Sequence, residues 1–197
     1  MRSSIRSITC CNLKSIKMQR FYRYVLYHLM GWKKEVTVEL PRKYIIALAP
    51  HTSNWDFLMG QLYSRAEGFR CEFMMKKEWF FWPLGPIFRS MGGIPVERKK
   101  HTSLTDQLAS IAQSREAFGL CITPEGTRKP TSEWKRGFYY IALKANIPIL
   151  LFGLDYGSKR IVCTKMLVPN GDADAQMQEI KQYYKSFQGK YPQNFAI

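Results

Sequence analysis

The stretch that decides the fold is YIIALAPHTSNWD, residues 44–56. Its first six residues form an uninterrupted apolar run ended by Pro50, which is typical of a strand buried on both faces of a sheet. A polar loop follows, and it leads into residues 56–66, where the pattern favours a helix. A buried strand, a polar loop and a helix in this order indicate an α/β domain.

The rest of the chain repeats this alternation of strands and helices. The pattern predicts a single α/β domain at residues 36–197, with a mixed, largely parallel sheet flanked by helices. The further strands are expected at residues 36–40, 70–75, 93–96, 119–123, 148–154 and 160–168, and the further helices at 104–118, 137–145 and 176–187.

Residues 1–35 form a basic segment ahead of this domain. They hold eight Lys and Arg residues against one acidic residue, a net charge of +7 within the +15 of the whole chain. Residues 13–32 predict an amphipathic helix ended by Gly31. Such a helix can lie in the interface of a bilayer or pack on the core of the domain, and we expect a membrane-interface helix. Its apolar face would comprise Met18, Phe21, Tyr22, Val25, Leu26 and Leu29.

The composition restricts the possible classes of protein. A net charge of +15 favours polyanionic partners, which are nucleic acid, an anionic membrane surface or phosphate-bearing ligands. A basic nucleic-acid-binding module is the alternative of another class. No helix-turn-helix, zinc or RNP signature accompanies the charge, so nucleic acid is not the expected partner. The longest stretch without a charged residue is 12 residues, too short for a spanning helix. Five cysteines without a Cys-x-x-Cys pair predict neither a metal site nor a disulfide scaffold, and they are typical of a reducing, cytoplasmic protein.

Polar loops follow three of the predicted strands. The first holds His51 and Asp56, and if it turns at the start of the helix, Asp56 can bind one imidazole nitrogen and leave the other as a base. The second runs from Gly93 to Lys100 and ends in three cations, of which Arg98 suits a phosphate as a bidentate partner. Open α/β sheets bind ligands at the carboxyl ends of their strands, so we expect these loops to lie together.

The third loop is Pro124-Glu125-Gly126-Thr127-Arg128. Gly126 permits a tight turn and Arg128 offers a second cationic fork. Glu125 can orient an acceptor hydroxyl or Arg98. Taken alone, the first loop could equally hold a surface histidine near a helix N-cap, the second could be a solvated basic turn, and the third would be weak evidence.

The segment Trp79–Phe88 lies between the first two loops and is almost wholly apolar. Its two prolines argue against regular structure. In the core it would bury two indole N–H groups that need partners, so contact with lipid is favoured over a core position.

Four blocks of the sequence together resemble the glycerolipid acyltransferase family, which includes the 1-acyl-glycerol-3-phosphate acyltransferases. His51-x4-Asp56 is similar to the first block of the family, and residues 93–98 are similar to the second. The third loop is similar to the third block and residues 145–149 to the fourth, so the resemblance extends over residues 44–155 in the family's order.

The resemblance implies transfer of an acyl group from a thioester to the hydroxyl of a lysolipid. Acyl-CoA or acyl carrier protein would be the co-substrate, with no tightly bound cofactor and no metal. The expected acceptor is 1-acyl-glycerol-3-phosphate, and another lysolipid such as a lyso-amino-acid lipid is the alternative. The enzyme would be peripheral, on the cytoplasmic face of an anionic membrane.

The resemblance also implies roles for particular residues. His51 would be the general base and Asp56 would orient it, as in a triad without its serine. No Gly-x-Ser-x-Gly elbow is present, in agreement with direct attack by the acceptor. The residues expected to bind substrate are Lys77, Gly93, Arg98, Glu125, Gly126, Thr127 and Arg128.

Overall fold

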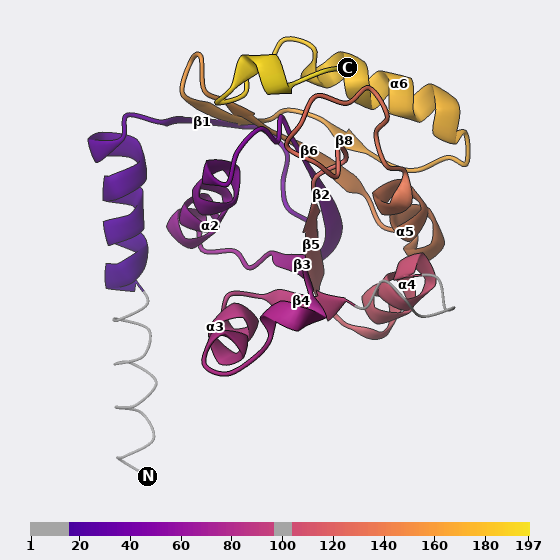
Figure 1. Ribbon diagram of the computed structural model, residues 1–197, viewed down its shortest axis with the longest axis horizontal. Coiled ribbons are helices and arrows are strands. Elements are labelled where there is room, and N and C mark those ends of the chain that lie inside the picture. The colour runs from indigo at the N-terminus through magenta and orange to yellow at the C-terminus, as the bar shows by residue number, and fades with distance from the viewer. Residues whose placement is uncertain (1–15, 97–103) are drawn as a thin grey trace.

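The computed structural model describes residues 16–96 and 104–197 (Figure 1). Arg98 and the first fifteen residues therefore lie outside the described part of the chain. Within it, eight strands form one sheet in the order β1-β7-β6-β2-β5-β3-β4, with β8 beside β6. The strands are β1 (Lys33–Val36), β2 (Lys43–Ala49), β3 (Glu72–Lys76), β4 (Gly93–Val96), β5 (Phe118–Ile122), β6 (Ile149–Asp155), β7 (Arg160–Cys163) and β8 (Met166–Leu167).

Strand β2 lies in the middle of the sheet and is parallel to both of its neighbours, β5 and β6. The pairs β3–β4, β3–β5 and β1–β7 are parallel as well. Strands β7 and β8 run antiparallel to β6. This arrangement confirms the predicted mixed, largely parallel sheet.

Helices cover both faces of the sheet (Figure 1). The N-terminal helix, residues 16–29, and α2 (Trp55–Glu67) pack on one face. On the other face lie α4 (Leu104–Ser114), α5 (Gly137–Ala145) and α6 (Ala173–Tyr184). In β2, Ile45 and Ala47 point toward α4–α6, whereas Ile46 and Leu48 point toward α2. The helices are η1 (Tyr24–Leu29, the π-helical end of the N-terminal helix), α2 (Trp55–Glu67), η2 (Lys77–Trp79), α3 (Leu84–Ser90), α4 (Leu104–Ser114), α5 (Gly137–Ala145), α6 (Ala173–Tyr184) and η3 (Pro192–Asn194).

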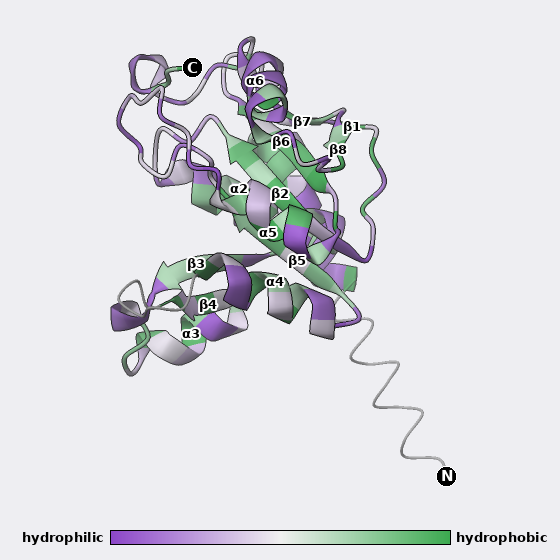
Figure 2. Ribbon diagram, turned by 90° about the vertical axis from the view of Figure 1, so that its right-hand side faces the viewer, coloured by the Kyte–Doolittle hydropathy of each residue, from purple (hydrophilic) through white to green (hydrophobic). Residues whose placement is uncertain are grey.

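The hydropathy of the residues follows this layering. Strands β2 and β6 form a hydrophobic centre, and the helices outside them carry hydrophilic residues on their outer surfaces (Figure 2). All of β6 is buried, as is β2 from Tyr44 onward. Burial on both faces explains why both strands are continuous apolar runs in the sequence.

Several elements differ from the sequence-based expectations. The first strand lies at Lys33–Val36 rather than at residues 36–40, because it pairs with β7 there. A short helix, α3, occupies a segment that was expected to be irregular. Its Pro86 is the third helical residue, where the backbone N–H has no intrahelical acceptor, so the ring breaks no bond. Helix α6 begins three residues early because the Asp172 side chain caps it at Ala175 N.

The apolar face of the N-terminal helix is divided between the core and the surface. Leu26 is fully buried, and Tyr22 packs beside it against the same core. Phe21 and Leu29 are 58% and 72% exposed. The boundary at residue 35 stays a prediction, and strand β1 lies across it.

Candidate active site

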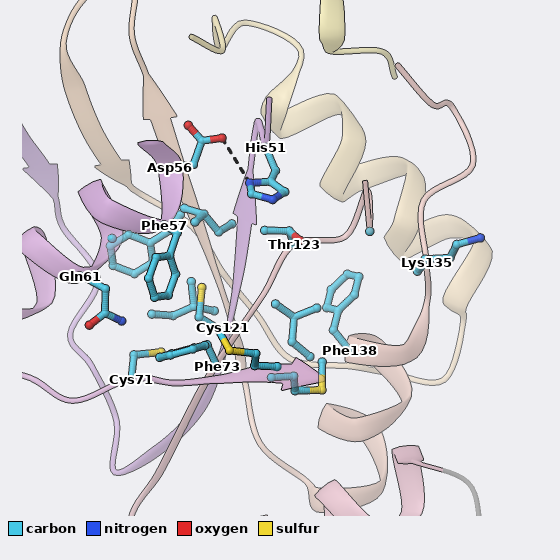
Figure 3. Close-up of a pocket in the computed structure, with 18 of the residues that line it drawn as sticks. His51, Asp56, Phe57, Gln61, Cys71, Phe73, Cys121, Thr123, Lys135 and Phe138 are labelled. Atoms are coloured by element: carbon cyan, nitrogen blue, oxygen red, sulfur yellow. Dashed lines mark ion pairs between the residues drawn. The ribbon is translucent and has the colours of Figure 1, made fainter. Parts of the chain in front are cut away.

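The loop between β2 and α2 brings His51 against Asp56. Asp56 is the second residue of α2, and its Oδ2 accepts hydrogen bonds from the N–H groups of Thr52 and Ser53, each at 2.8 Å. These bonds fold the loop back over the first turn of the helix. His51 Nδ1 then lies 3.2 Å from the same Oδ2 (Figure 3).

The surroundings of this pair determine which imidazole nitrogen is available. Asp56 is fully buried, and its Oδ1 accepts a hydrogen bond of 2.8 Å from the hydroxyl of Tyr156. Although the ring is not aligned for a linear hydrogen bond, Nδ1 is buried and has no other partner among the described residues. Such bonds are often long in a free enzyme and tighten when substrate binds. The His51 side chain is 19% exposed, so Nε2 is the nitrogen left for a substrate.

Glu125 anchors the backbone of His51. Both of its carboxylate oxygens accept from the His51 N–H, at 3.1 and 2.9 Å. Burial, together with the negative charge of Asp56, raises the pKa of Glu125 to about 7 against the opposing effect of that N–H. The carboxylate thus contacts the loop that holds His51, and its expected contact with substrate stays a prediction.

The rest of the third loop lies beside the first because β2 and β5 are parallel neighbours. Gly126 has a φ of +66°, which favours glycine, and its N–H closes the turn on Thr123 O at 3.1 Å. Thr127 Oγ1 accepts from the Lys129 N–H at 3.2 Å. Arg128 donates a short hydrogen bond to Asn54 Oδ1 and so places a cation next to the His51 loop.

Lys77 and Gly93 are not brought to this place. Lys77 lines a separate cavity of about 400 Å³ together with Arg89. Gly93 is buried, and a Cβ at this position would lie 2.8 Å from the Phe88 carbonyl oxygen, so its small size serves the packing of α3. Arg98 lies outside the described residues. The substrate-binding roles of all three stay predictions.

A cavity of about 1230 Å³ extends from His51 into the protein. Strands β3 and β5 pair only at Glu72–Leu120 and Phe73–Cys121, and beyond these pairs they separate. The cavity occupies the resulting gap in the sheet and is lined from both faces (Figure 3). Its apolar walls include Phe57, Phe73 and Cys121 on the side of α2, and Met74 and Phe138 on the side of α4 and α5. A cavity of this size and lining suits a long apolar chain.

Tyr156 is the site residue that sequence reasoning missed. It follows β6, whose carboxyl end lies at the same edge of the sheet as those of β2 and β5. The signal that could have found it is a hydroxyl-bearing residue directly after a buried strand in an open α/β sheet.

The comparison with protein families agrees with this geometry. Residues 33–153, more than half of the chain, match the family model described as Acyltransferase. The chain therefore belongs to the acyltransferase family, and this confirms the resemblance seen in the sequence. The protein is an enzyme of this family, and its His-x4-Asp residues lie in contact.

A solved structure shares the fold. It is the crystal structure of the 1-acyl-sn-glycerophosphate (LPA) acyltransferase PlsC from Thermotoga maritima, with a TM-score of 0.60 and 15% sequence identity. The match covers 93% of this chain and 80% of the other. No curated protein matches the sequence.

Among residues 16–96 and 104–197, no group of three or more His, Cys, Asp or Glu side chains could hold a metal ion. None of the helices in this part of the chain is long and apolar enough to cross a membrane.

Proposed function

We propose that the protein transfers a fatty acyl group from acyl-CoA or acyl carrier protein to the hydroxyl of 1-acyl-glycerol-3-phosphate. The observation that carries the proposal is the His51–Asp56 pair at one end of a long apolar cavity, with Arg128 beside it. A base, an apolar chain site and a cation at one place are what this reaction needs.

In the proposed mechanism, His51 Nε2 takes the proton of the acceptor hydroxyl as the oxygen attacks the thioester carbonyl carbon. The new C–O bond forms, the C–S bond breaks, and the proton on His51 passes to the departing thiolate. Asp56 stabilises the imidazolium in between. The N–H groups of His51 and of the two residues after it are bonded to Glu125 and Asp56, so they hold the base rather than the oxyanion.

The acyl chain of the donor would lie in the cavity between β3 and β5. Its walls are apolar near Phe57, Phe73 and Phe138, and His51 lies at one end. Each buried methylene contributes about 0.8 kcal/mol, so chain length would be selected by how far the cavity extends.

The phosphate of the acceptor would lie near Arg128. This guanidinium lines the cavity and is oriented by Asn54, two residues before Asp56. A guanidinium binds a phosphate through two parallel hydrogen bonds, which an ammonium group cannot form. Arg98 is proposed as a second phosphate ligand from its place in the sequence.

A panel of acceptors tests this function. The purified enzyme is incubated with acyl-CoA or acyl carrier protein and with 1-acyl-glycerol-3-phosphate, neutral lysolipids or lyso-amino-acid lipids, and the products are identified by mass. We expect the highest kcat/KM with the phosphate acceptor. Arg128→Ala should raise the KM of this acceptor about tenfold or more, Arg128→Lys should restore it only in part, and the donor KM should change little. Preference for an uncharged acceptor, or full restoration by Lys, would contradict the assignment.

We also propose that the enzyme binds an anionic membrane through its N-terminal helix and the segment Trp79–Phe88. Phe21 and Leu29 are exposed on the helix, and the exposed cations Lys17 and Arg20 lie within one turn of Phe21. In the second segment Trp82 is 84% exposed. Exposed aromatic residues near cations are typical of proteins that lie in the membrane interface.

Sedimentation with vesicles tests the membrane contact. Lys17→Glu with Arg20→Glu should lower the partition onto anionic vesicles at least about thirtyfold, since each juxtamembrane cation contributes about 1 kcal/mol. Arg23 is left unchanged because it forms an ion pair with Glu67 at 3.0 Å. The control Arg42→Glu with Lys185→Glu makes the same change in net charge at two exposed residues elsewhere. If both double variants lose vesicle binding equally, or if the Lys17/Arg20 variant loses none, the membrane contact does not lie on the N-terminal helix.

A further inference from the structure

The two oxygens of the Asp56 carboxylate have separate partners. Oδ2 faces the loop and accepts from Thr52 and Ser53, with His51 Nδ1 at 3.2 Å. Oδ1 faces the opposite way, and Tyr156 is its hydrogen-bond donor within the described part of the chain, at 2.8 Å. The orientation of the carboxylate about its last torsion therefore depends on a residue one hundred positions along the chain.

The ring of Tyr156 is itself held in place. Trp32, which is buried, packs against it edge to face, with 5.0 Å between the ring centroids and an interplanar angle of 87°. The Tyr156 N–H donates to Gln188 O at 2.9 Å. Burial, with the charge of Asp56 and the bond to it, raises the pKa of Tyr156 well above its usual value. The hydroxyl thus keeps its proton and remains a donor at any pH at which the enzyme works.

Removal of this hydroxyl would affect Asp56 more than the packing. A phenylalanine ring fills the same space, but Oδ1 would lose its donor in a fully buried position, where a charged acceptor without a donor is unfavourable. The carboxylate could then rotate and change its angle to Nδ1. Because Nδ1 lies 3.2 Å from Oδ2 but is not aligned for a hydrogen bond, a small rotation of the carboxylate is enough to change this contact.

We propose that Tyr156 is a positioning residue of the active site, which holds Asp56 in the orientation that serves His51. The inference rests on the proposed function, in which His51 is the base. Tyr156 does not line the large cavity, so it acts through Asp56 and has no contact with substrate. Trp32 links Tyr156 to the end of the N-terminal helix, so the segment proposed to bind the membrane also supports the catalytic pair.

A double-mutant cycle tests this role. Tyr156→Phe should lower kcat about tenfold and leave both KM values within about twofold. In an Asp56→Asn background the same change should cost less than about twofold, since the carboxylate through which Tyr156 acts is already lost. Tyr139→Phe is the matched control, since it removes a buried hydroxyl that donates to Gln176 Oε1 at 2.7 Å. This hydroxyl does not contact Asp56 or His51, so the variant should leave kcat unchanged.

Trp32→Phe provides a second, independent variant. It weakens the edge contact with Tyr156 and should lower kcat in the same direction, again only where Asp56 is present. Equal losses of kcat in both backgrounds would show that Tyr156 is only structural, and a wild-type kcat for Tyr156→Phe would also overturn the proposal. Retention of activity by His51→Ala would instead contradict the proposed function, so the two failures are distinguishable.

Discussion

His51→Ala is expected to lower kcat by roughly 10²–10⁴-fold, which is the contribution of a positioned general base. The imidazole is the group at the site that can accept the hydroxyl proton through Nε2, because Asp56 and Glu125 are directed at the loop itself. Without the imidazole, Asp56 keeps its hydrogen bonds from the Thr52 and Ser53 N–H groups and from the Tyr156 hydroxyl. The variant should therefore remain folded.

The measurement is the initial rate of acyl transfer to detergent-dispersed lysolipid, with circular dichroism to verify the fold. His28→Ala makes the same substitution at an exposed histidine of the N-terminal helix and should leave the rate unchanged. A loss smaller than tenfold in a folded His51→Ala protein would exclude His51 as the base.

Gly60→Phe is expected to change the chain length that the enzyme accepts. Gly60 lies in α2 and lines the large cavity, and a Cβ added there meets no atom within 4 Å. A phenyl ring at this position would occupy space proposed for the acyl chain. Exclusion of about four methylenes would cost about 3 kcal/mol, or roughly a hundredfold in kcat/KM for a long-chain donor. A short-chain donor should lose little.

Gly60→Ala is the control for this prediction. Its methyl group leaves most of the cavity open, and alanine should stabilise the helix by about 0.5–1 kcal/mol relative to glycine. Competition between long-chain and short-chain acyl-CoA in one reaction gives the ratio of kcat/KM directly. If Gly60→Phe lowers kcat/KM equally for the long-chain and the short-chain donor, the acyl chain does not lie in this part of the cavity.

Local patterns in the sequence were sufficient for much of the fold. The bounds expected for β4 and α5 agree with the structure. Strand β2 begins one residue earlier than expected, and α2 is one residue longer at both ends. These elements carry strong signals, which are continuous apolar runs or regular helical spacing between clear breaks. Strand β1 was placed wrongly because its residues become a strand only by pairing with β7, 127 positions away at Lys33–Arg160.

Part of the site is also a local property of the chain. His51 and Asp56 are five residues apart, and a single turn at the start of α2 brings them together. The third loop joins them because β5 is parallel to β2, as the alternation of strands and helices implies. The sequence by itself therefore determined the class of fold, the family and the pair that we expect to be catalytic.

Only the tertiary structure decided what surrounds that pair. The contact of Tyr156 with Asp56 and that of Glu125 with the His51 N–H join residues 100 and 74 positions apart. The cavity exists because β3 separates from β5 after two residue pairs. The N-terminal helix is buried only where it packs into the same core cluster as α2, and the rest of its apolar face is exposed. None of these features has a periodic signal in the sequence. Each arises from the packing of distant segments, where the free energy depends on shape and on pairs of groups rather than on the order of residues along one element.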